Sequence, residues 1–183
     1  MGKAAIHTAS LVRAAMRLFR RQGFASTGLQ QILSESGAPK GSLYHYFPSG
    51  KEALGAAAIE LAGSMIHEML AEHAARHEDP GAFVRAYCRT MAGWMRESAF
   101  RSGCPIATTL LETAPASPAI TAAGRRAIDG WIDVIAGVLA RAGTERREAR
   151  SRAQLIVAAM EGALVLSRVR QSAQPILDVA KLV

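Results

Sequence analysis

A short run between residues 37 and 54, GAPKGSLYHYFPSGKEAL, gathers side chains suited to contact a polyanion. It holds three aromatic residues within four positions, although Phe, Trp and Tyr make up only 5% of the chain. Phenol, imidazole and hydroxyl groups can hydrogen-bond phosphate oxygens, rings can pack on thymine methyl groups, and small residues permit close approach. The residue types therefore indicate contact with nucleic acid, through Lys40, Gly41, Ser42, Tyr44, His45 and Tyr46.

The elements that must position these residues are two short helices joined by a tight turn. Apolar residues at helical spacing predict a helix over residues 29–36, and Gly37 is the residue expected where a sharp turn ends it. Pro39 can open the next helix, since a proline at the first helical position loses no hydrogen bond. Leu43 and Phe47 are spaced i, i+4 and can face inward, whereas the three residues between them cannot all enter one core. A helix-turn-helix is the resulting expectation.

The placement of charge supports a polyanion partner for this part of the chain. The net charge is +7, and residues 1–51 hold seven Lys or Arg with one acid, Glu35. The other 132 residues hold 15 basic and 14 acidic groups and are close to balance. Such asymmetry indicates an electrostatic footprint for nucleic acid, although a solvated basic face without a partner remains the alternative.

The rest of the chain also has a helical pattern, and strand signals are absent, which predicts an all-α fold. Ser49 and Glu52 have the spacing of a capping box, so a long helix is expected to begin there. This places a boundary at about Ser49, between a helix-turn-helix DNA-binding domain, residues 1–48, and a second helical domain, residues 49–183. The first helix of the chain is expected to end near Gly23, and the long helix that begins at about Ser49 is expected to reach about His77. The next helix is expected to begin at Pro80, with Asp79 as its cap. Four further helices are expected between Gly103 and Pro115 and over Ser117–Gly143, Thr144–Gln171 and Ile176–Val183.

Residues that could support catalysis or bind a metal do not form a convincing set. His73 and His77 share a helix face but lack a third ligand at a suitable spacing. No Ser-His-Asp order, nucleotide-binding loop or paired-carboxylate context is present, so we expect neither an enzyme nor a cofactor. Cys88 and Cys104 are expected to be reduced, with a redox role for Cys104 as the alternative. No apolar run is long enough for a membrane span and no secretory signal is found, so we expect no membrane partner and a cytoplasmic location.

The segment RLFRRQGFASTGLQQILSESGAPKGSLYHYFPSGKEAL resembles the N-terminal region of the TetR family of bacterial regulators. The resemblance covers roughly residues 10–55, and GCPIATTLLETAP further on is similar to the LmrA/YxaF-type branch. It implies an all-helical homodimer that binds double-stranded operator DNA and represses transcription until a small effector binds. It also implies DNA contacts at Thr27, Gln30, Lys40, Ser42, Tyr44, His45, Tyr46 and Lys51. Pro39, where many members have a hydroxyl residue, and Gly50, which looks inserted, depart from the family pattern.

The C-terminal part offers candidate surfaces for the effector, whose identity the sequence does not give, and for the second subunit. Flexible thioethers and aromatic rings suit a pocket for flat apolar ligands, and a carboxylate could meet a cationic one, although such stripes are also ordinary core. The candidates for the effector are Met65, Met69, Tyr87, Met91, Trp94, Met95, Thr108, Glu112 and Trp131. The smooth surface expected at the dimer interface consists of Ala158, Ala159, Gly162 and Ala163. A ligand-independent architectural DNA-binding protein is the alternative function.

Overall fold

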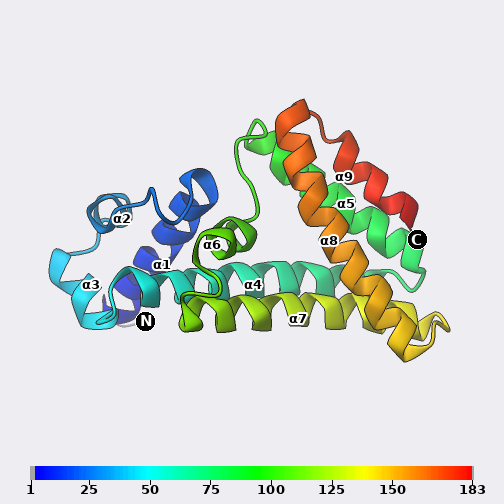
Figure 1. The fold of residues 1–183 in the computed structure, drawn as a ribbon, viewed down its shortest axis with the longest axis horizontal. Coiled ribbons are helices and arrows are strands. Elements are labelled where there is room, and N and C mark those ends of the chain that lie inside the picture. Colours follow the sequence, from blue (N-terminus) through cyan, green and yellow to red (C-terminus); the bar gives the residue numbers. More distant parts are fainter. Residues whose placement is uncertain (1–2, 183) are drawn as a thin grey trace. The chain divides into compact units, whose positions relative to one another are not determined.

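The computed structural model describes residues 3–182, and within that range the chain forms α-helices and one short 3₁₀ helix but no strand (Figure 1). The predicted all-α fold is therefore confirmed for the described residues. The helices are α1 (Lys3–Gln22), α2 (Leu29–Ser36), α3 (Lys40–Tyr46), α4 (Lys51–Arg76), α5 (Pro80–Glu97), α6 (Pro105–Thr113), α7 (Pro118–Arg141), α8 (Arg146–Arg170), α9 (Gln174–Asp178) and the 3₁₀ helix η1 (Val179–Leu182).

The chain divides into two compact units that do not follow the order of the sequence. Unit 1 contains the described residues up to Ser64 together with Pro105–Ala127, and unit 2 contains Met65–Cys104 and the described residues from Ile128 onward. Helix α6 and the first part of α7 thus belong with the N-terminal helices. The functional boundary expected at residue 49 stays a prediction.

Unit 1 has its core where α1, α2 and α3 meet the beginning of α4. Leu11 and Phe19 from α1, Ile32 from α2, Leu43 from α3 and Leu54 from α4 are all buried in it. Burying one such side chain contributes about 1.5–3 kcal/mol relative to leaving it in water. This shared core explains how helices of seven or eight residues, too short to be stable alone, keep their structure.

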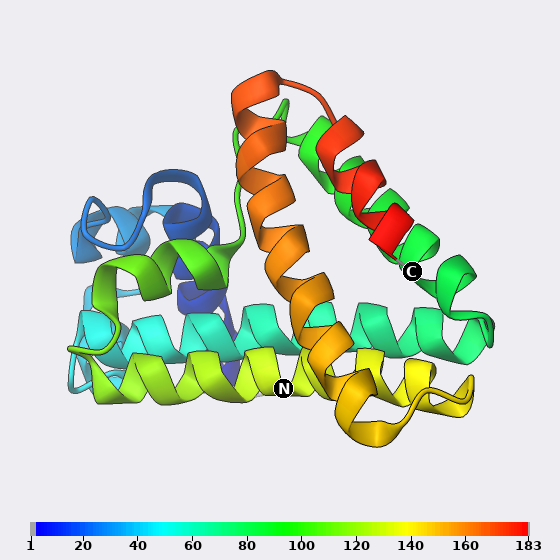
Figure 2. The ribbon, with the colours of Figure 1, turned by 45° about the vertical axis from the view of Figure 1, so that its right-hand side comes forward.

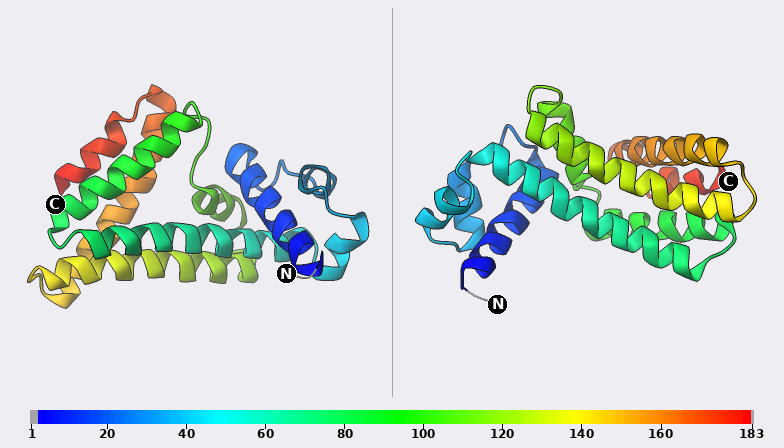
Figure 3. Two further views of the ribbon diagram at one scale, coloured as in Figure 1. Left: turned by 180° about the vertical axis from the view of Figure 1, so that it is seen from behind. Right: turned by 90° about the horizontal axis from the view of Figure 1, so that it is seen from below.

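The second sequence segment of unit 1 packs closely on α4. Figure 3 shows α4 and α7 side by side, and within unit 1 the contact is made where Gly55 meets Ile120. A Cβ atom at Gly55 would lie 2.9 Å from Ile120 Cδ1 and 2.9 Å from Phe24 Cε2, so a larger residue would push the helices apart. Glu60 of α4 adds an ion pair with Arg126 of α7, with 2.5 Å between the charged atoms.

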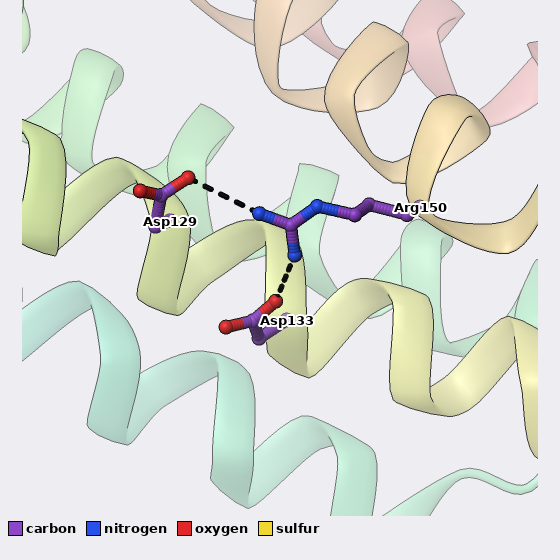
Figure 4. A network of polar contacts seen from close by, with 3 residues as sticks. All are labelled: Asp129, Asp133 and Arg150. Carbon is purple, nitrogen blue, oxygen red and sulfur yellow. Dashed lines mark hydrogen bonds and ion pairs between the residues drawn. The ribbon is translucent and has the colours of Figure 1, made fainter. Parts of the chain in front are cut away.

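Unit 2 is built around α5, α8 and the C-terminal segment α9–η1, which lies beside both helices (Figure 2). Its buried side chains include Phe83 from α5, Met160 from α8 and Ile176 from α9. Arg150 of α8 also reaches two carboxylates one turn apart on α7, Asp129 at 3.3 Å and Asp133 (Figure 4). Because these charges are about half exposed, each pair contributes no more than about 1 kcal/mol.

Two helix starts differ from the sequence expectation. Helix α4 begins at Lys51, and Glu52 accepts a hydrogen bond from the Ser117 hydroxyl, so the expected capping box with Ser49 does not form. Helix α8 is capped by Glu145, whose carboxylate accepts from two backbone N–H groups, where Thr144 was expected. The cap of α5 was predicted correctly, because Asp79 Oδ2 accepts from the N–H of Ala82 at 2.6 Å.

Candidate nucleic-acid interface

The turn between α2 and α3 has the geometry of a helix-turn-helix. Gly37 adopts a left-handed conformation with φ of 65°, and its N–H donates to the Leu33 carbonyl at 3.1 Å. A side chain at this position would be strained, which explains why glycine closes the helix. Pro39 then precedes α3 with φ of −57°, and the chain re-enters a helix at Lys40.

Helix α3 has an inner face that holds it and an outer face that is free to contact a partner. Leu43 is fully buried and Phe47, just after the helix, is nearly so. On the outside, Lys40, Gly41, Tyr44 and His45 are exposed, and 53% of Tyr44 is accessible to solvent. The remaining candidates, Ser42 and Tyr46, are half-buried. The exposed set supplies one cation, two ring systems that can form hydrogen bonds, and a position without a side chain.

The acid closest in sequence to this surface is already paired. Residues 1–51 contain one acid, Glu35. Its carboxylate accepts a hydrogen bond from Arg17 Nε at 3.0 Å. The positive charge of Lys40 is consequently not neutralised by Glu35. An excess of cations is therefore left on this part of unit 1 for phosphate groups.

Two other residues predicted to contact DNA lie close to the start of α2, and they differ in their exposure to solvent. Thr27 is fully buried, and its hydroxyl donates to the Gly23 carbonyl at 2.7 Å. It therefore stabilises the turn after α1, and we do not carry it into the proposed interface. Gln30 is exposed and is free to make the expected contact.

Lys51 is directed toward the protein rather than outward. Its Nζ donates to the Ala25 carbonyl at 3.3 Å and lies 4.4 Å from the centre of the Phe24 ring. Burial lowers the pKa of Lys51, and the negative charge of Glu112 raises it in part. In this conformation the lysine links the beginning of α4 to the turn between α1 and α2, so a phosphate contact would require its side chain to rotate.

Glu112 of α6 holds the same turn from the other side. Its carboxylate accepts from the backbone N–H groups of Phe24, at 3.2 Å, and Ala25, at 2.5 Å. The sequence suggested this carboxylate as a partner for a cationic ligand, whereas in the structure it is the hydrogen-bond acceptor for two backbone N–H groups of the turn. No local signal could have shown this contact, because the partners are 88 and 87 residues apart in the chain.

Removing this carboxylate is expected to loosen unit 1. Glu112→Ala leaves two backbone N–H groups without their protein acceptor, and because the site is exposed to water we expect a loss of about 1–2 kcal/mol. Hydrogen exchange at Phe24 and Ala25 should become faster and the melting temperature should fall. Glu97→Ala, at an exposed acid of α5, is the control and should leave both measurements unchanged. Unchanged exchange at the two amides in Glu112→Ala would show that the contact does not form in solution.

The residues predicted to bind an effector are divided between the two units. Thr108 and Glu112 lie in unit 1, and the other seven lie in unit 2. Of these, Tyr87, Met91, Met95 and Trp131 are buried, Met69 and Trp94 are half-buried, and Met65 is 47% exposed. The buried members are part of the core of unit 2, whereas the exposed position of Met65 does not match the pocket that was expected for it.

Burial shifts the pKa of two ionisable groups in unit 2. Burial raises the pKa of Tyr87 well above its usual range, and the nearby Glu161 charge adds to this. Burial also raises the pKa of Glu161, which forms a side-chain hydrogen bond with Cys104.

Residues 3–182 contain neither a cluster of metal ligands nor a helix that could span a membrane. In the described part of the chain, no three His, Cys, Asp or Glu side chains are grouped as metal ligands would be. The Nε2 atom of His73 instead lies 3.0 Å from Thr90 Oγ1. None of the helices within residues 3–182 has the length and apolar character needed to cross a bilayer.

A helix-turn-helix with an exposed cationic and aromatic outer face, in a chain with a second all-helical unit, defines the class of helical DNA-binding transcription regulators. Comparison with known proteins gives the family. The model for "Bacterial regulatory proteins, tetR family" matches residues 11–58, and that for "Transcriptional regulator LmrA/YxaF-like, C-terminal domain" matches residues 80–182. The chain belongs to the TetR family, with an LmrA/YxaF-like C-terminal domain.

Relatives and solved structures agree with this assignment. The chain is 33% identical to the uncharacterized HTH-type transcriptional regulator YxaF of Bacillus subtilis over 96% of its length and 89% of the relative. It is 31% identical to the HTH-type transcriptional regulator LmrA of the same organism, covering 94% and 92% of the two chains. The crystal structure of regulatory protein TetR from Rhodobacter sphaeroides superposes with a TM-score of 0.82 at 25% identity, over 94% of each chain. Both curated relatives are named as HTH-type transcriptional regulators.

Proposed function

We propose that this TetR-family regulator is a dimeric repressor that inserts α3 into the major groove of operator DNA. The outer face of α3, where Lys40, Tyr44 and His45 are exposed while Leu43 is buried behind them, carries the proposal. In this arrangement the aromatic groups are available to bases and phosphates, and the core fixes the helix that presents them. The protein would act in the cytoplasm, where bacterial operators lie.

The proposal can be tested on an operator selected from random duplexes by the protein itself. Tyr44→Ala should weaken operator binding by about 1–3 kcal/mol, because it removes a contact to a base or to the sugar-phosphate backbone of the DNA. Fluorescence anisotropy measures this change. Lys40→Ala should weaken binding to all sequences and reduce the salt dependence by about one phosphate contact. Arg146→Ala in unit 2 also removes one exposed positive charge and serves as the control. If both α3 variants bind the operator like the wild type, α3 is not the recognition helix.

We also propose that a small hydrophobic effector releases the repressor. The match of residues 80–182 to the LmrA/YxaF-like domain and the buried aromatic and thioether groups of unit 2 support this proposal. Such an effector must bind the DNA-free state more tightly than the DNA-bound state, because equal affinity would shift nothing. A thermal-shift screen with planar apolar compounds, followed by titration of the protein–operator complex, would identify it. Uniform DNA coverage in footprints, together with no effect of any compound, would instead favour the architectural alternative.

The proposed homodimer would form through an apolar stripe on α8. Residues 155, 158, 162, 165 and 169 follow the alternating spacing of three and four that places side chains in one seam of a helix pair. All five are exposed in the protomer, Leu155 by 64%, Val165 by 63% and Val169 by 77%. Of the residues expected there from sequence, Ala158 and Gly162 lie on this stripe, Ala159 is half-buried and Ala163 is buried within the protomer. Covering so much exposed apolar surface with a second copy would favour association.

A further inference from the structure

An open cavity of about 660 Å³ lies within unit 2, where α5 meets the C-terminal segment α9–η1. Its wall on the α5 side comes from the helix face that carries Arg85, Arg89 and Arg96. Positions four and seven residues apart fall on the same side of a helix, so these three side chains form a row. Lys181 of η1 faces the same space. None of the four belongs to the predicted effector-binding set.

Of these four cations, two form an ion pair with a carboxylate and two do not. Arg85 pairs with Asp79 at 3.4 Å, and Lys181 pairs with Asp178 at 2.8 Å. For Arg89 and Arg96, the part of the chain that the structure describes offers no acidic partner. Their Cα atoms are separated by two helical turns, roughly 10.5 Å, a distance that two arginine side chains can bridge through a shared anion.

The floor of the cavity is apolar and uncharged. Leu177 and Ala180 line it from the C-terminal segment, and Cys88, which is almost completely buried, lines it from α5. Burial raises the pKa of Cys88 to about 11, so near neutral pH the thiol is protonated and adds no negative charge. The guanidinium groups at the rim therefore dominate the local potential.

We infer that this cavity binds a small organic anion, with its acidic group between Arg89 and Arg96 and a compact apolar body against Leu177 and Ala180. A neutral apolar molecule would leave both guanidinium groups without a partner, and an inorganic anion would not cover the floor. A DNA duplex would satisfy the arginines, but its bases are stacked and paired and do not enter an apolar cavity without being flipped out. The ligand would bridge α5 and α9–η1, because both elements supply contacts to it.

Isothermal titration with naphthalene-2-carboxylate tests the inference, with naphthalene-2-methanol as a neutral molecule carrying the same ring. We expect the carboxylate to bind about tenfold or more tightly than the alcohol, and to raise the melting temperature of the protein. Arg89→Ala combined with Arg96→Ala should remove this preference. The corresponding double lysine variant keeps the charge and should retain most of it.

Arg146→Ala is the matched control, because Arg146 is exposed at the beginning of α8 and does not line the cavity. It should bind the carboxylate like the wild type. Equal affinity of the wild type for the two naphthalene compounds would overturn the inference, as would unchanged carboxylate binding in the double alanine variant. Both alanine changes are at exposed side chains without ion pairs, and an unchanged circular dichroism spectrum would confirm that the variant is folded.

Discussion

Replacing Leu43 with alanine is expected to destabilise unit 1 by about 2–5 kcal/mol and to abolish DNA binding. Leu43 is fully buried beneath α3, where it belongs to the same core as Ile32 and Phe47. A helix of seven residues has too few internal hydrogen bonds to persist without that packing. Urea unfolding followed by circular dichroism at 222 nm should show the loss as an earlier transition.

Tyr44→Ala is the matched comparison for this experiment, because it removes a larger side chain from the outer face of the same helix. We expect its free energy of unfolding to change by no more than about 0.5 kcal/mol while operator binding weakens. The two variants would then distinguish a core residue from a contact residue. Leu43→Ala would lose stability, and Tyr44→Ala would lose only affinity for DNA. A Leu43→Ala protein as stable as the wild type would mean that α3 is not held in the way described.

Gly162→Arg is expected to convert the proposed dimer into a monomer at micromolar concentration, weakening self-association by about 100-fold or more. In the protomer a Cβ atom at this position would meet nothing within 4 Å, so the folded chain has room for the substitution. In a symmetric α8 pair, the same position would face its own copy, and two arginines would bring bulk and like charge to the contact. Sedimentation equilibrium measures the change directly.

Gly162→Ala provides the graded control. Alanine is favoured over glycine within a helix by about 1 kcal/mol, so a free protomer should become more stable. In the dimer that gain is opposed by the added methyl group if the helices approach closely at this point. A monomeric wild type, or a Gly162→Arg protein that still sediments as a dimer, would rule out the α8 stripe as the contact.

The N-terminal helices could be predicted well from sequence because their signals are local. The bounds of α2 match the prediction, since its apolar residues and Gly37 are neighbours in the chain. The beginning of α4 could not be predicted from the capping-box spacing. Gly50 adopts a left-handed conformation with φ of 63°, and helix α4 starts only after it, at Lys51. The departure from the family pattern at Gly50 thus coincides with the place where the local rule was wrong.

The candidate interface was predicted less completely, because sequence pattern gives side-chain type but not orientation. Lys40, Tyr44 and His45 are exposed, whereas Thr27 is buried and Lys51 points toward Phe24 and Ala25. The last two cases depend on contacts with the turn after α1. The role of Glu112 depends on a contact between segments almost 90 residues apart, which periodicity cannot show.

The membership of α6 and the start of α7 in unit 1 matters for anyone exchanging parts between regulators of this family. A fragment that ends near Ser64 would lack the Glu112 carboxylate, the Ile120 side chain packed at Gly55 and the Arg126 partner of Glu60. A chimera that takes its DNA specificity from this protein should therefore include Pro105–Ala127 with the N-terminal helices. The portable recognition module is discontinuous in sequence, and a single cut cannot isolate it.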